Sequence, residues 1–420
     1  MIPGYSIIIL NISSYPYLMK LLRIQGTPLD TEKTILVIDL THGGRTLGRA
    51  IERYSTARVL LYDLYGKDKG SAIPDFDLCI SPLHSPVMNP ILMRDERVIS
   101  HHRATGEILR EFKKHLSCRI VEITGTKGKT SVATLLKMML GREMRVLSLT
   151  SRGVEYTTCS NHSRFLRRDL SITPAHTLEA MAIAESEGLE VDIALFEVSL
   201  GFTGAGDLNV LTSLRGDYPI AGGMLKASDA KKYTMTDLDG EVVELDDSGG
   251  ALPGGMRFGR RQQDNLKLAI YTAEKLGVSI DTIEAVSASS SQIPSRMEII
   301  ENGDWVVVDD SNPAFDVENL TQGIEEILEV EGEHIVIVGG SYRGSCSKVD
   351  LDGVRRVIDR YSGKIRFYLS GEMGQDLIRA GAAYPFLEGG IDAMVDDVRE
   401  RSNGNKGVIL ISRKQEEGYR

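Results

Sequence analysis

The 420-residue sequence has few cysteines and no long apolar run. Its cysteines stand singly, without the C-x-x-C spacing of a metal clip or a redox pair: Cys79, Cys118, Cys159 and Cys346. No apolar stretch approaches the roughly 20 residues that a membrane-spanning helix needs. The run at residues 7–10 lacks the basic flank and the cleavage site of a signal peptide, so we interpret residues 1–33 as an N-terminal extension. These absences predict a cytoplasmic protein with reduced thiols and no membrane partner.

Basic residues are also fewer than acidic residues. The 49 Lys and Arg side chains are outnumbered by 59 Asp and Glu, which gives a formal net charge of −10. Such a chain repels a polyphosphate backbone, so nucleic acid is not an expected partner. Apolar residues, in contrast, make up 42% of the chain. This content can fill about three cores at roughly 150 residues a domain.

The first regular pattern lies in residues 34–117. Residues 34–40 (TILVIDL) form an apolar run typical of a strand in a parallel sheet, and residues 58–62 (RVLLY) indicate a second strand. A glycine-rich turn and a helix over residues 46–54 separate them, which predicts a βαβ unit. The turn is equally compatible with a ligand site and with a tight connection that needs glycine. Scattered prolines then indicate a loop-rich tail.

Strand and helix patterns alternate again in residues 118–293 and 294–420. In the central segment we expect strands over residues 119–124, 145–150, 191–197 and 208–213, and helices over residues 129–140, 177–187 and 265–276. In the C-terminal segment the same alternation runs from residue 305 to residue 412. It predicts an α/β protein with a Rossmann-like substrate-binding domain, a central P-loop ATP-binding domain with a parallel sheet, and a Rossmann-like C-terminal domain.

The strongest chemical signal is TGTKGKTS at residues 124–131, between a predicted strand and a predicted helix. Glycines let backbone N–H groups turn toward a phosphate, and the helix N-terminus adds positive potential. The lysine adds a positive charge for the phosphate, and the hydroxyl can bind magnesium. Ile123 stands where the strict Walker pattern has glycine, so this is a shortened P-loop. We expect ATP or GTP to bind through Gly125, Thr126, Lys127, Gly128, Lys129, Thr130 and Ser131.

A second signal is Glu197, at the end of the strand predicted over residues 191–197. A carboxylate at the carboxyl edge of a parallel sheet, near a P-loop, is placed to bind magnesium together with the hydroxyl of Thr130. The alternative is an acidic N-cap for the following segment.

On these residues the chain, from about residue 34 to its C-terminus, resembles the Mur ligase superfamily, the ADP-forming enzymes that activate a carboxylate as an acyl phosphate. The loop at residues 124–131 is similar to that family's short P-loop. Thr173-Pro174 resembles the family's Thr-Pro dipeptide, which stands before the helix that precedes the strand with the glutamate. Glu197-Val198-Ser199 resembles the family's magnesium-binding motif. The resemblance implies three domains around one site, with ATP and Mg²⁺ as cofactors.

The resemblance identifies four more residues. Asn265 is similar to an asparagine that contacts the nucleotide, Arg296 to an arginine of the third domain, and Asp310 to a ribose-binding aspartate. Lys231 is similar to a lysine that often carries a carbamate and bridges metal; an ordinary surface lysine beside Lys232 is the alternative. The catalytic residues implied are Lys129, Glu197, Lys231 and Arg296. One departure is Asp217-Tyr218, where the family usually has Asp-His, so the histidine ligand of a second magnesium is missing.

The substrate is indicated by two further features. Arginines gather after the second strand of the central segment, where they can receive several carboxylates or form a solvated charged face: Arg152, Arg164, Arg167 and Arg168. Residues 39–44 (DLTHGG) resemble the N-terminal signature of the archaeal Mur-like ligases that make coenzyme F430, a nickel tetrapyrrole. That resemblance implies a nickel-tetrapyrrole acid as substrate, with His42 near it. An imidazole that only caps the neighbouring turn is the alternative.

We therefore expect an ATP- and magnesium-dependent ligase that activates a propionate of seco-F430 acid and closes a carbocyclic ring. A rival enzyme is an amide-forming ligase that adds an amino acid to a peptide precursor such as that of pseudomurein. A rival of another class is a nucleotide-regulated binding protein, against which Glu197 and Arg296 argue.

Overall fold

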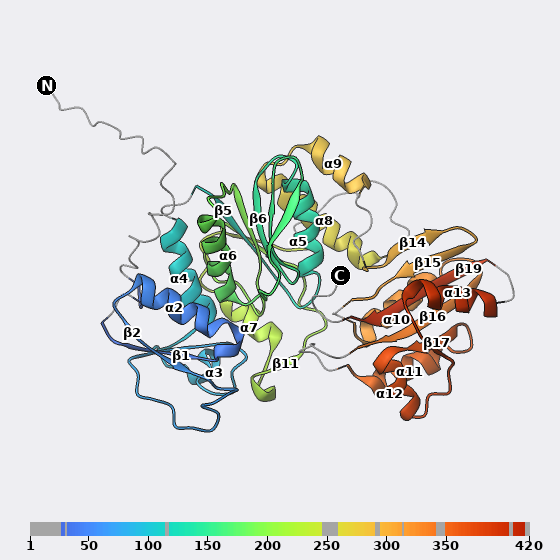
Figure 1. The fold of residues 1–420 in the computed structure, drawn as a ribbon, viewed down its shortest axis with the longest axis horizontal. Coiled ribbons are helices and arrows are strands. Elements are labelled where there is room, and N and C mark those ends of the chain that lie inside the picture. Colours follow the sequence, from blue (N-terminus) through green and yellow to red (C-terminus); the bar gives the residue numbers. More distant parts are fainter. Residues whose placement is uncertain are drawn as a thin grey trace. The chain divides into compact units, whose positions relative to one another are not determined.

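A computed structural model describes residues 27–29, 32–113, 117–245, 259–289, 295–312, 315–341, 349–402 and 406–415 (Figure 1). The chain forms two compact units, Met1–Lys129 with Leu140–Val243, and Thr130–Met139 with Glu244–Arg420. Most of the N-terminal extension and Cys346 lie outside the described residues. The other three cysteines are unpaired. Among the described helices, none combines the length and the apolar character that crossing a bilayer requires.

The first sheet has four parallel strands in the order β2-β1-β3-β4. Its strands are β1 (Thr34–Ile38), β2 (Arg58–Tyr62), β3 (Leu78–Ser81) and β4 (Val98–Ser100). Its helices are α2 (Arg45–Tyr54), α3 (Pro90–Met93) and α4 (His101–Lys113). The predicted βαβ unit is confirmed, but the loop-rich tail is wrong. Strands of four and three residues between prolines are too short to show a hydrophobic period.

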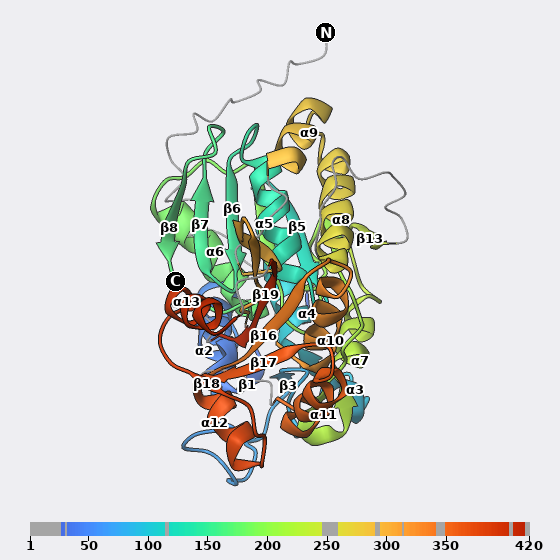
Figure 2. The ribbon, with the colours of Figure 1, turned by 90° about the vertical axis from the view of Figure 1, so that its right-hand side faces the viewer.

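The second sheet has seven strands in the order β13-β10-β5-β9-β6-β7-β8. The parallel strands are β5 (Arg119–Thr124), β6 (Val146–Thr150), β9 (Ile193–Glu197), β10 (Leu208–Leu211) and β13 (Glu241–Val243). At one edge, β7 (Gly153–Thr157) and β8 (Ser163–Arg167) add an antiparallel ribbon, seen beside β6 in Figure 2. The four strands predicted here are confirmed, and the segment that carries the arginines after the second of them forms this ribbon.

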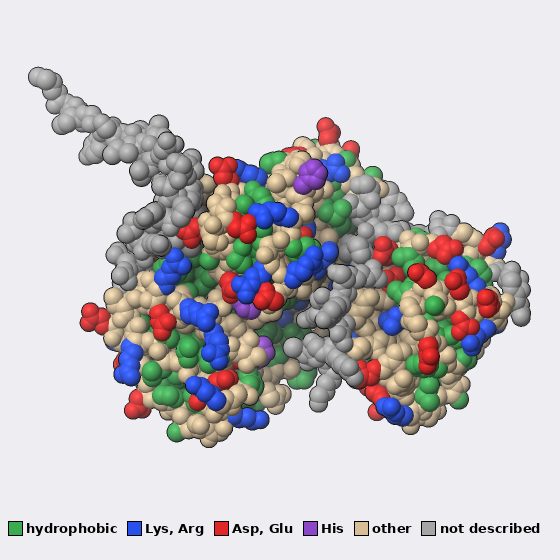
Figure 3. Space-filling model, in the orientation of Figure 1, with side chains coloured by type: hydrophobic (Ala, Val, Ile, Leu, Met, Phe, Trp, Pro, Cys, Tyr) green, Lys and Arg blue, Asp and Glu red, His purple; other side chains and the backbone are tan. Residues whose placement is uncertain are grey.

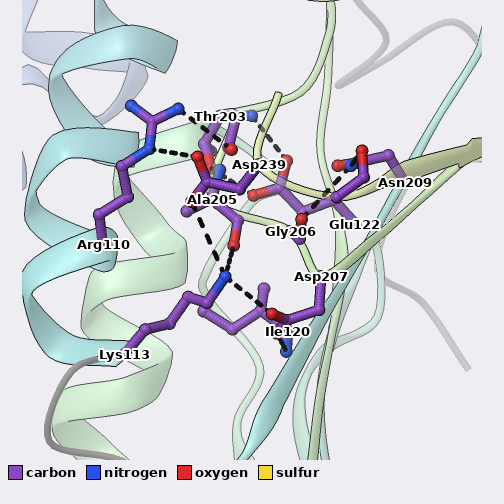
Figure 4. A network of polar contacts seen from close by, with 12 residues as sticks. Arg110, Lys113, Ile120, Glu122, Thr203, Ala205, Gly206, Asp207, Asn209 and Asp239 are labelled. Atoms are coloured by element: carbon purple, nitrogen blue, oxygen red, sulfur yellow. Dashed lines mark hydrogen bonds and ion pairs between the residues drawn. The ribbon is translucent and has the colours of Figure 1, made fainter. Parts of the chain in front are cut away.

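The first two sheets share one hydrophobic core. Leu47 of α2, Phe112 of α4 and Leu178 of α6 (Pro174–Ser186) belong to a single buried cluster. Polar contacts tie α4 to the second sheet: the Lys113 ammonium lies 2.8 Å from the Asp207 carboxylate, and Arg110 Nε donates to Asp239 over 2.9 Å (Figure 4). The boundary predicted at residue 117 therefore falls inside one compact unit.

Shorter elements complete this unit: β11 (Pro219–Ile220), the turn Ala221–Gly223, β12 (Leu225–Lys226) and α7 (Ala227–Thr234). The helix α5 (Lys129–Leu140) begins in the first unit and continues in the second.

The second unit contains a six-stranded sheet in the order β14-β15-β19-β16-β17-β18. Its strands are β14 (Glu298–Asn302), β15 (Trp305–Asp309), β16 (Glu333–Gly340), β17 (Arg366–Ser370), β18 (Phe386–Leu387) and β19 (Gly407–Lys414), all parallel except β14. The helices are α8 (Arg260–Leu276), α9 (Ile280–Ser289), α10 (Val317–Ile327), α11 (Leu351–Tyr361), α12 (Gly371–Arg379) and α13 (Ile391–Arg401). The predicted alternation is confirmed.

Both faces of this sheet are covered. Val306 and Val308 of β15 pack into the cluster with α10 and α11, while Val307 between them packs with α13 on the other face. Because both faces of β15 are buried, its sequence is a continuous apolar run. Outside the core, acidic and basic side chains are interspersed on the face of this unit visible in Figure 3. The prediction of an α/β fold with mainly parallel sheets is confirmed.

Candidate functional site

The loop at residues 125–128 connects β5 to α5, as the sequence predicts. Gly125 and Gly128 have φ angles of +150° and +88°, which favour glycine. A Cβ on Gly125 would lie 2.1 Å from Thr212 Oγ1, so a side chain has no room there. Thr126 N and Thr126 Oγ1 both donate to the carbonyl of Ser213, over 2.7 and 2.9 Å. The segment after β10 therefore holds the loop in its curved form.

Lys129 is the first residue of α5. Its ammonium donates to the carbonyl of Gly125 over 3.1 Å, so the side chain folds back over the loop. No acidic residue lies in the first turn of α5 to neutralise the positive end of the helix. Thr130 and Ser131 follow as the next residues of the helix, Thr130 half-buried and Ser131 buried. Backbone, lysine and helix terminus together make a cradle suited to an anion.

Glu197 ends β9 and is 2% exposed. In the parallel pairing of β5 with β9 it lies opposite Ile123, two residues before Gly125. Its Oε2 accepts a hydrogen bond of 3.2 Å from the N–H of Ser151, at the turn after β6. No helix lies between β9 and β10, so the N-cap alternative is wrong. The carboxylate instead lies at the carboxyl edge of the sheet, beside the strand that leads into the loop.

Lys231 lies within α7 and is fully buried, whereas its neighbour Lys232 is exposed. The surface-lysine alternative is therefore wrong. Its ammonium has the carbonyl of Ala227 at 3.4 Å. Burial and, to a smaller extent, the charge of Lys129 lower the pKa of Lys231 to about 7, and Asp217 opposes both effects. A large fraction of this amine is thus neutral near pH 7, which an exposed lysine is not.

Replacing Lys231 with methionine is expected to stabilise the protein most at neutral pH. Because the folded-state pKa is about 7 and the unfolded value is near 10.5, the penalty for burying the ammonium is full below pH 7 and is lost as the pH rises to 10.5. The wild-type free energy of unfolding should therefore gain about 1.4 kcal/mol per pH unit relative to the variant within that window. Denaturant unfolding of both proteins at pH 7.5 and pH 9.5 measures this change.

The matched control is Lys232→Met, which changes the exposed neighbour and should leave the difference from wild type independent of pH. A difference between wild type and Lys231→Met that stays constant from pH 7.5 to 9.5 would contradict the buried-amine assignment.

The four arginines proposed to meet substrate lie on and around the β7–β8 ribbon, and all four are exposed. Arg167 is engaged in ion pairs with Asp169 at 2.7 Å and Glu179 at 2.9 Å, which is the solvated-face alternative. The guanidinium groups of Arg152 and Arg168 instead lie 5.8 and 3.4 Å from the centre of the Phe165 ring. Within the described residues neither has an ion pair, so these two remain the candidates for a carboxylate-rich ligand.

His42 lies in the glycine-rich turn Leu40–Gly44 after β1. The turn is capped by Asp39, whose Oδ1 accepts from the N–H groups of Thr41 and His42 at 3.0 and 3.3 Å. The imidazole therefore is not the cap, and that alternative is wrong. Instead His42 Nδ1 lies 2.6 Å from Asp39 Oδ2, which also accepts a hydrogen bond from His84 Nε2 at 2.9 Å. Sequence reasoning missed His84 because it is 45 positions from Asp39.

This turn contacts the N-terminus of α6. A Cβ on Gly43 would lie 2.7 Å from Thr173 Oγ1, at the N-cap of α6, where Pro174 is the first helical residue. The Ser199 N–H donates to Ile172 over 2.8 Å, and the Ser199 carbonyl lies 2.7 Å from His102 Nε2. The Thr-Pro motif therefore connects the His42 turn with the segment that follows Glu197.

Three predicted site residues belong to the second unit. Asn265 lies inside α8, five residues after its start and not at its beginning as expected, and donates to Gln262 over 3.2 Å. Arg296 stands between Ser295 and Met297, with φ angles of 58° and 54°. Asp310 is 6% exposed and accepts from Asn312 Nδ2 over 3.1 Å.

Arg296 and Asp310 are brought near one another by the pairing of β14 with β15. Ser295 Oγ donates to Asp309 over 2.9 Å, and Glu298 lies opposite Asp309 in the antiparallel register. The turn that carries Arg296 is thus fastened to the end of β15, where Asp310 follows.

The sequence has relatives among ligases. The profile for "coenzyme F430 synthetase CfbE, C-terminal domain" matches residues 299–415. A coenzyme F430 synthetase of Methanosarcina acetivorans is 28% identical over 84% of this chain and 93% of its own length. The corresponding synthetase of Methanocaldococcus jannaschii is 24% identical over 86% and 95%. A UDP-N-acetylmuramoylalanine–D-glutamate ligase of Prochlorococcus marinus is 22% identical over 64% and 63%.

Solved structures share the fold. A bifunctional folylpolyglutamate synthase/dihydrofolate synthase of Yersinia pestis, complexed with AMPPNP and Mn ion, has a TM-score of 0.53 and 13% identity, and the match covers 74% of this chain and 90% of that one. MurF of Acinetobacter baumannii has a TM-score of 0.51 and 12% identity over 76% and 78%. These likenesses concern the fold.

Proposed function

We propose that this chain, which resembles the Mur ligases and among them the coenzyme F430 synthetases, is an ATP-dependent ligase of coenzyme F430 biosynthesis. The observation that carries the proposal is the glycine loop of residues 125–128, with Lys129 folded over it and Glu197 at the adjacent sheet edge. The two named synthetases, which align with most of this chain, support the choice of pathway. The substrate proposed is the nickel-containing seco-F430 acid.

The reaction we propose has two steps. A propionate carboxylate of the substrate attacks the γ-phosphate of ATP, forming an acyl phosphate and releasing ADP. A carbon of the same macrocycle then attacks the activated carbonyl, so that a C–C bond closes the carbocyclic ring and phosphate leaves. Because the nucleophile belongs to the substrate itself, the site needs no pocket for a separate amino acid.

Charge explains the roles of the residues. An anion approaches an anion in the first step, so the ammonium of Lys129 and the positive end of α5 stabilise the phosphate oxygens, and Arg296 is proposed to add a further cation. The hydroxyl of Thr130 and the carboxylate of Glu197 are hard oxygen ligands of the kind that Mg²⁺ takes. Bound there, Mg²⁺ would neutralise charge on the transferring phosphate.

Lys231 is proposed to carry a carbamate. Its amine, with a pKa of about 7, is available as the neutral nucleophile that adds to CO₂ with loss of one proton, which turns a buried neutral amine into an anion. The buried position beside Lys129 supports this assignment, because the product carboxylate would be attracted to that ammonium.

The decisive experiment supplies purified protein with ATP, Mg²⁺ and one candidate substrate at a time. ADP release that requires the nickel seco-acid supports the proposal, and the pigment's absorption then reports ring closure. The D-glutamate ligase among the relatives makes amide formation the rival to test. ADP release that requires a free amino acid, and that the tetrapyrrole does not stimulate, would reject the proposal.

A further inference from the structure

Asp39 is the centre of a polar cluster that the proposed phosphoryl transfer does not use. The residue directly follows β1 and is fully buried, with a φ of 69° in the left-handed region. Burial disfavours the ionised carboxyl, but hydrogen bonds from His42 and His84 outweigh burial and hold the pKa of Asp39 below its usual value. The group is therefore a buried carboxylate whose two ring partners lie toward the surface, His42 with 40% and His84 with 25% of the side chain exposed.

The hydrogen bonds decide which ring nitrogens carry protons. A carboxylate only accepts, so His42 presents Nδ1–H and His84 presents Nε2–H to Asp39 Oδ2, at 2.6 and 2.9 Å. In the neutral form of each imidazole, the opposite ring nitrogen is a lone-pair donor. Neither of these nitrogens has a hydrogen-bond partner among the described residues. This arrangement, an imidazole oriented by a carboxylate on its far side, is the one that metal-binding histidines adopt.

The two imidazoles pack against other rings. The rings of His42 and His84 pack edge to face with centroids 4.7 Å apart, and Tyr65 contacts both, at 5.8 and 6.3 Å. Behind them the fully buried ring of His101 donates to the carbonyl of Ile38 over 2.9 Å. Burial lowers the pKa of His101 to about 3, so no cation from that side competes with a metal.

The cluster is also connected to the segment that follows Glu197. His101 contacts β1 just before Asp39, and the adjacent His102 contacts Ser199, two residues beyond Glu197. The His42 turn is therefore joined through α4 to the edge of the sheet where phosphoryl transfer is proposed. A large planar ligand with one carboxylate at that edge extends beyond it, toward such neighbouring groups.

We propose that His42, oriented by Asp39 and packed against His84, is an axial ligand to the nickel of the tetrapyrrole substrate. This inference rests on the proposed function. His42 carries the role because it is the more exposed of the two rings. A zinc site that belongs to the protein has three or four protein ligands. The Asp39 carboxylate, in contrast, already accepts four hydrogen bonds. A nickel with four equatorial nitrogens from its macrocycle needs only one or two axial ligands.

The test uses coenzyme F430 and its nickel-free form as probes of the intact protein. Nickel X-ray absorption and the visible spectrum of the bound pigment are recorded for wild type, for His42→Ala and for the control His162→Ala, which removes an exposed imidazole of the β7–β8 turn. We expect one imidazole nitrogen on nickel in wild type and in the control, and its loss in His42→Ala. Affinity for the nickel form should fall about ten-fold or more, while affinity for the nickel-free form stays unchanged. Added free imidazole should restore the wild-type spectrum.

The outcomes separate this inference from the proposed function. Turnover of the nickel seco-acid with a nickel spectrum that is the same in wild type and His42→Ala would overturn the axial-ligand role and leave the ligase function standing. Wild type that neither binds nor converts the nickel tetrapyrrole would overturn both. A further arm titrates Ni²⁺ alone: binding of the free ion that depends on His42, without binding of the pigment, would assign the imidazole to a free cation and reject the tetrapyrrole source. Asp39→Asn, with thermal unfolding as its folding control, should weaken the nickel form alone, since it removes the group that orients the ring.

Discussion

Replacing Lys129 with alanine is expected to lower the rate of substrate-dependent ADP release by about a thousand-fold. The ammonium lies over the loop at 3.1 Å from the carbonyl of Gly125, so its removal takes away a cation that we propose stabilises the phosphate oxygens. The backbone of the loop should persist, because Gly125, Thr126 and Thr212 determine its shape. ADP release measured at saturating ATP and substrate gives the change in kcat, and calorimetry gives the change in nucleotide affinity.

The matched control for this variant is Lys137→Ala. Lys137 lies on the same helix, two turns further on, and is partly exposed. Its replacement should change kcat by less than about two-fold, since screening by water reduces its field at the loop. A Lys129→Ala protein with the full rate of ADP release would remove the P-loop from the mechanism. Full biological output of the same variant without any ADP release would favour the regulatory binding protein.

The second large effect is expected for Glu197→Gln, with a loss of about a hundred- to a thousand-fold in kcat. The amide is isosteric and can still accept from the N–H of Ser151, so the local structure should stay intact while the negative charge is lost. A magnesium ligand without charge binds the cation more weakly, so the Mg²⁺ concentration at half-maximal rate should rise together with the fall in kcat. A titration of ADP release with Mg²⁺ measures both quantities.

Glu187→Gln is the control for the loss of one carboxylate. Glu187 is exposed just after α6 and pairs with Arg164 at 2.6 Å, so its replacement should leave the Mg²⁺ dependence unchanged. If Glu197→Gln lowered the rate without any shift in the Mg²⁺ requirement, the carboxylate would have a role other than holding the metal.

Prediction from the sequence succeeded for local structure that depends on consecutive residues. The strand, loop and helix at residues 119–140 were predicted with the bounds that the structure gives β5 and α5. Glycines, lysine and hydroxyls follow one another within seven positions, so their geometry is determined locally by the loop and the helix terminus. The same holds for Glu197, because the end of a buried strand is visible as the end of an apolar run.

Prediction failed where elements were short or antiparallel. The strands β3 and β4 have too few residues to show the alternation of apolar and polar residues that is typical of a strand. In the β7–β8 ribbon, β8 is largely exposed and carries polar and charged residues. The ribbon changes the interpretation of the arginines, because Arg167 is paired with Asp169 and Glu179, whereas Arg152 and Arg168 lie against Phe165.

The sequence by itself determined the class of fold and the glycine-rich loop proposed to bind phosphate. Both depend on contiguous patterns of apolar, glycine and basic residues. Only the tertiary structure decided that Lys231 is buried beside Lys129 and that Asp39 joins His42 to His84. The physical reason is that the pKa of an amine and the orientation of an imidazole depend on what packs around them. Those neighbours come from segments tens of residues apart, which meet only when the sheets and helices have assembled.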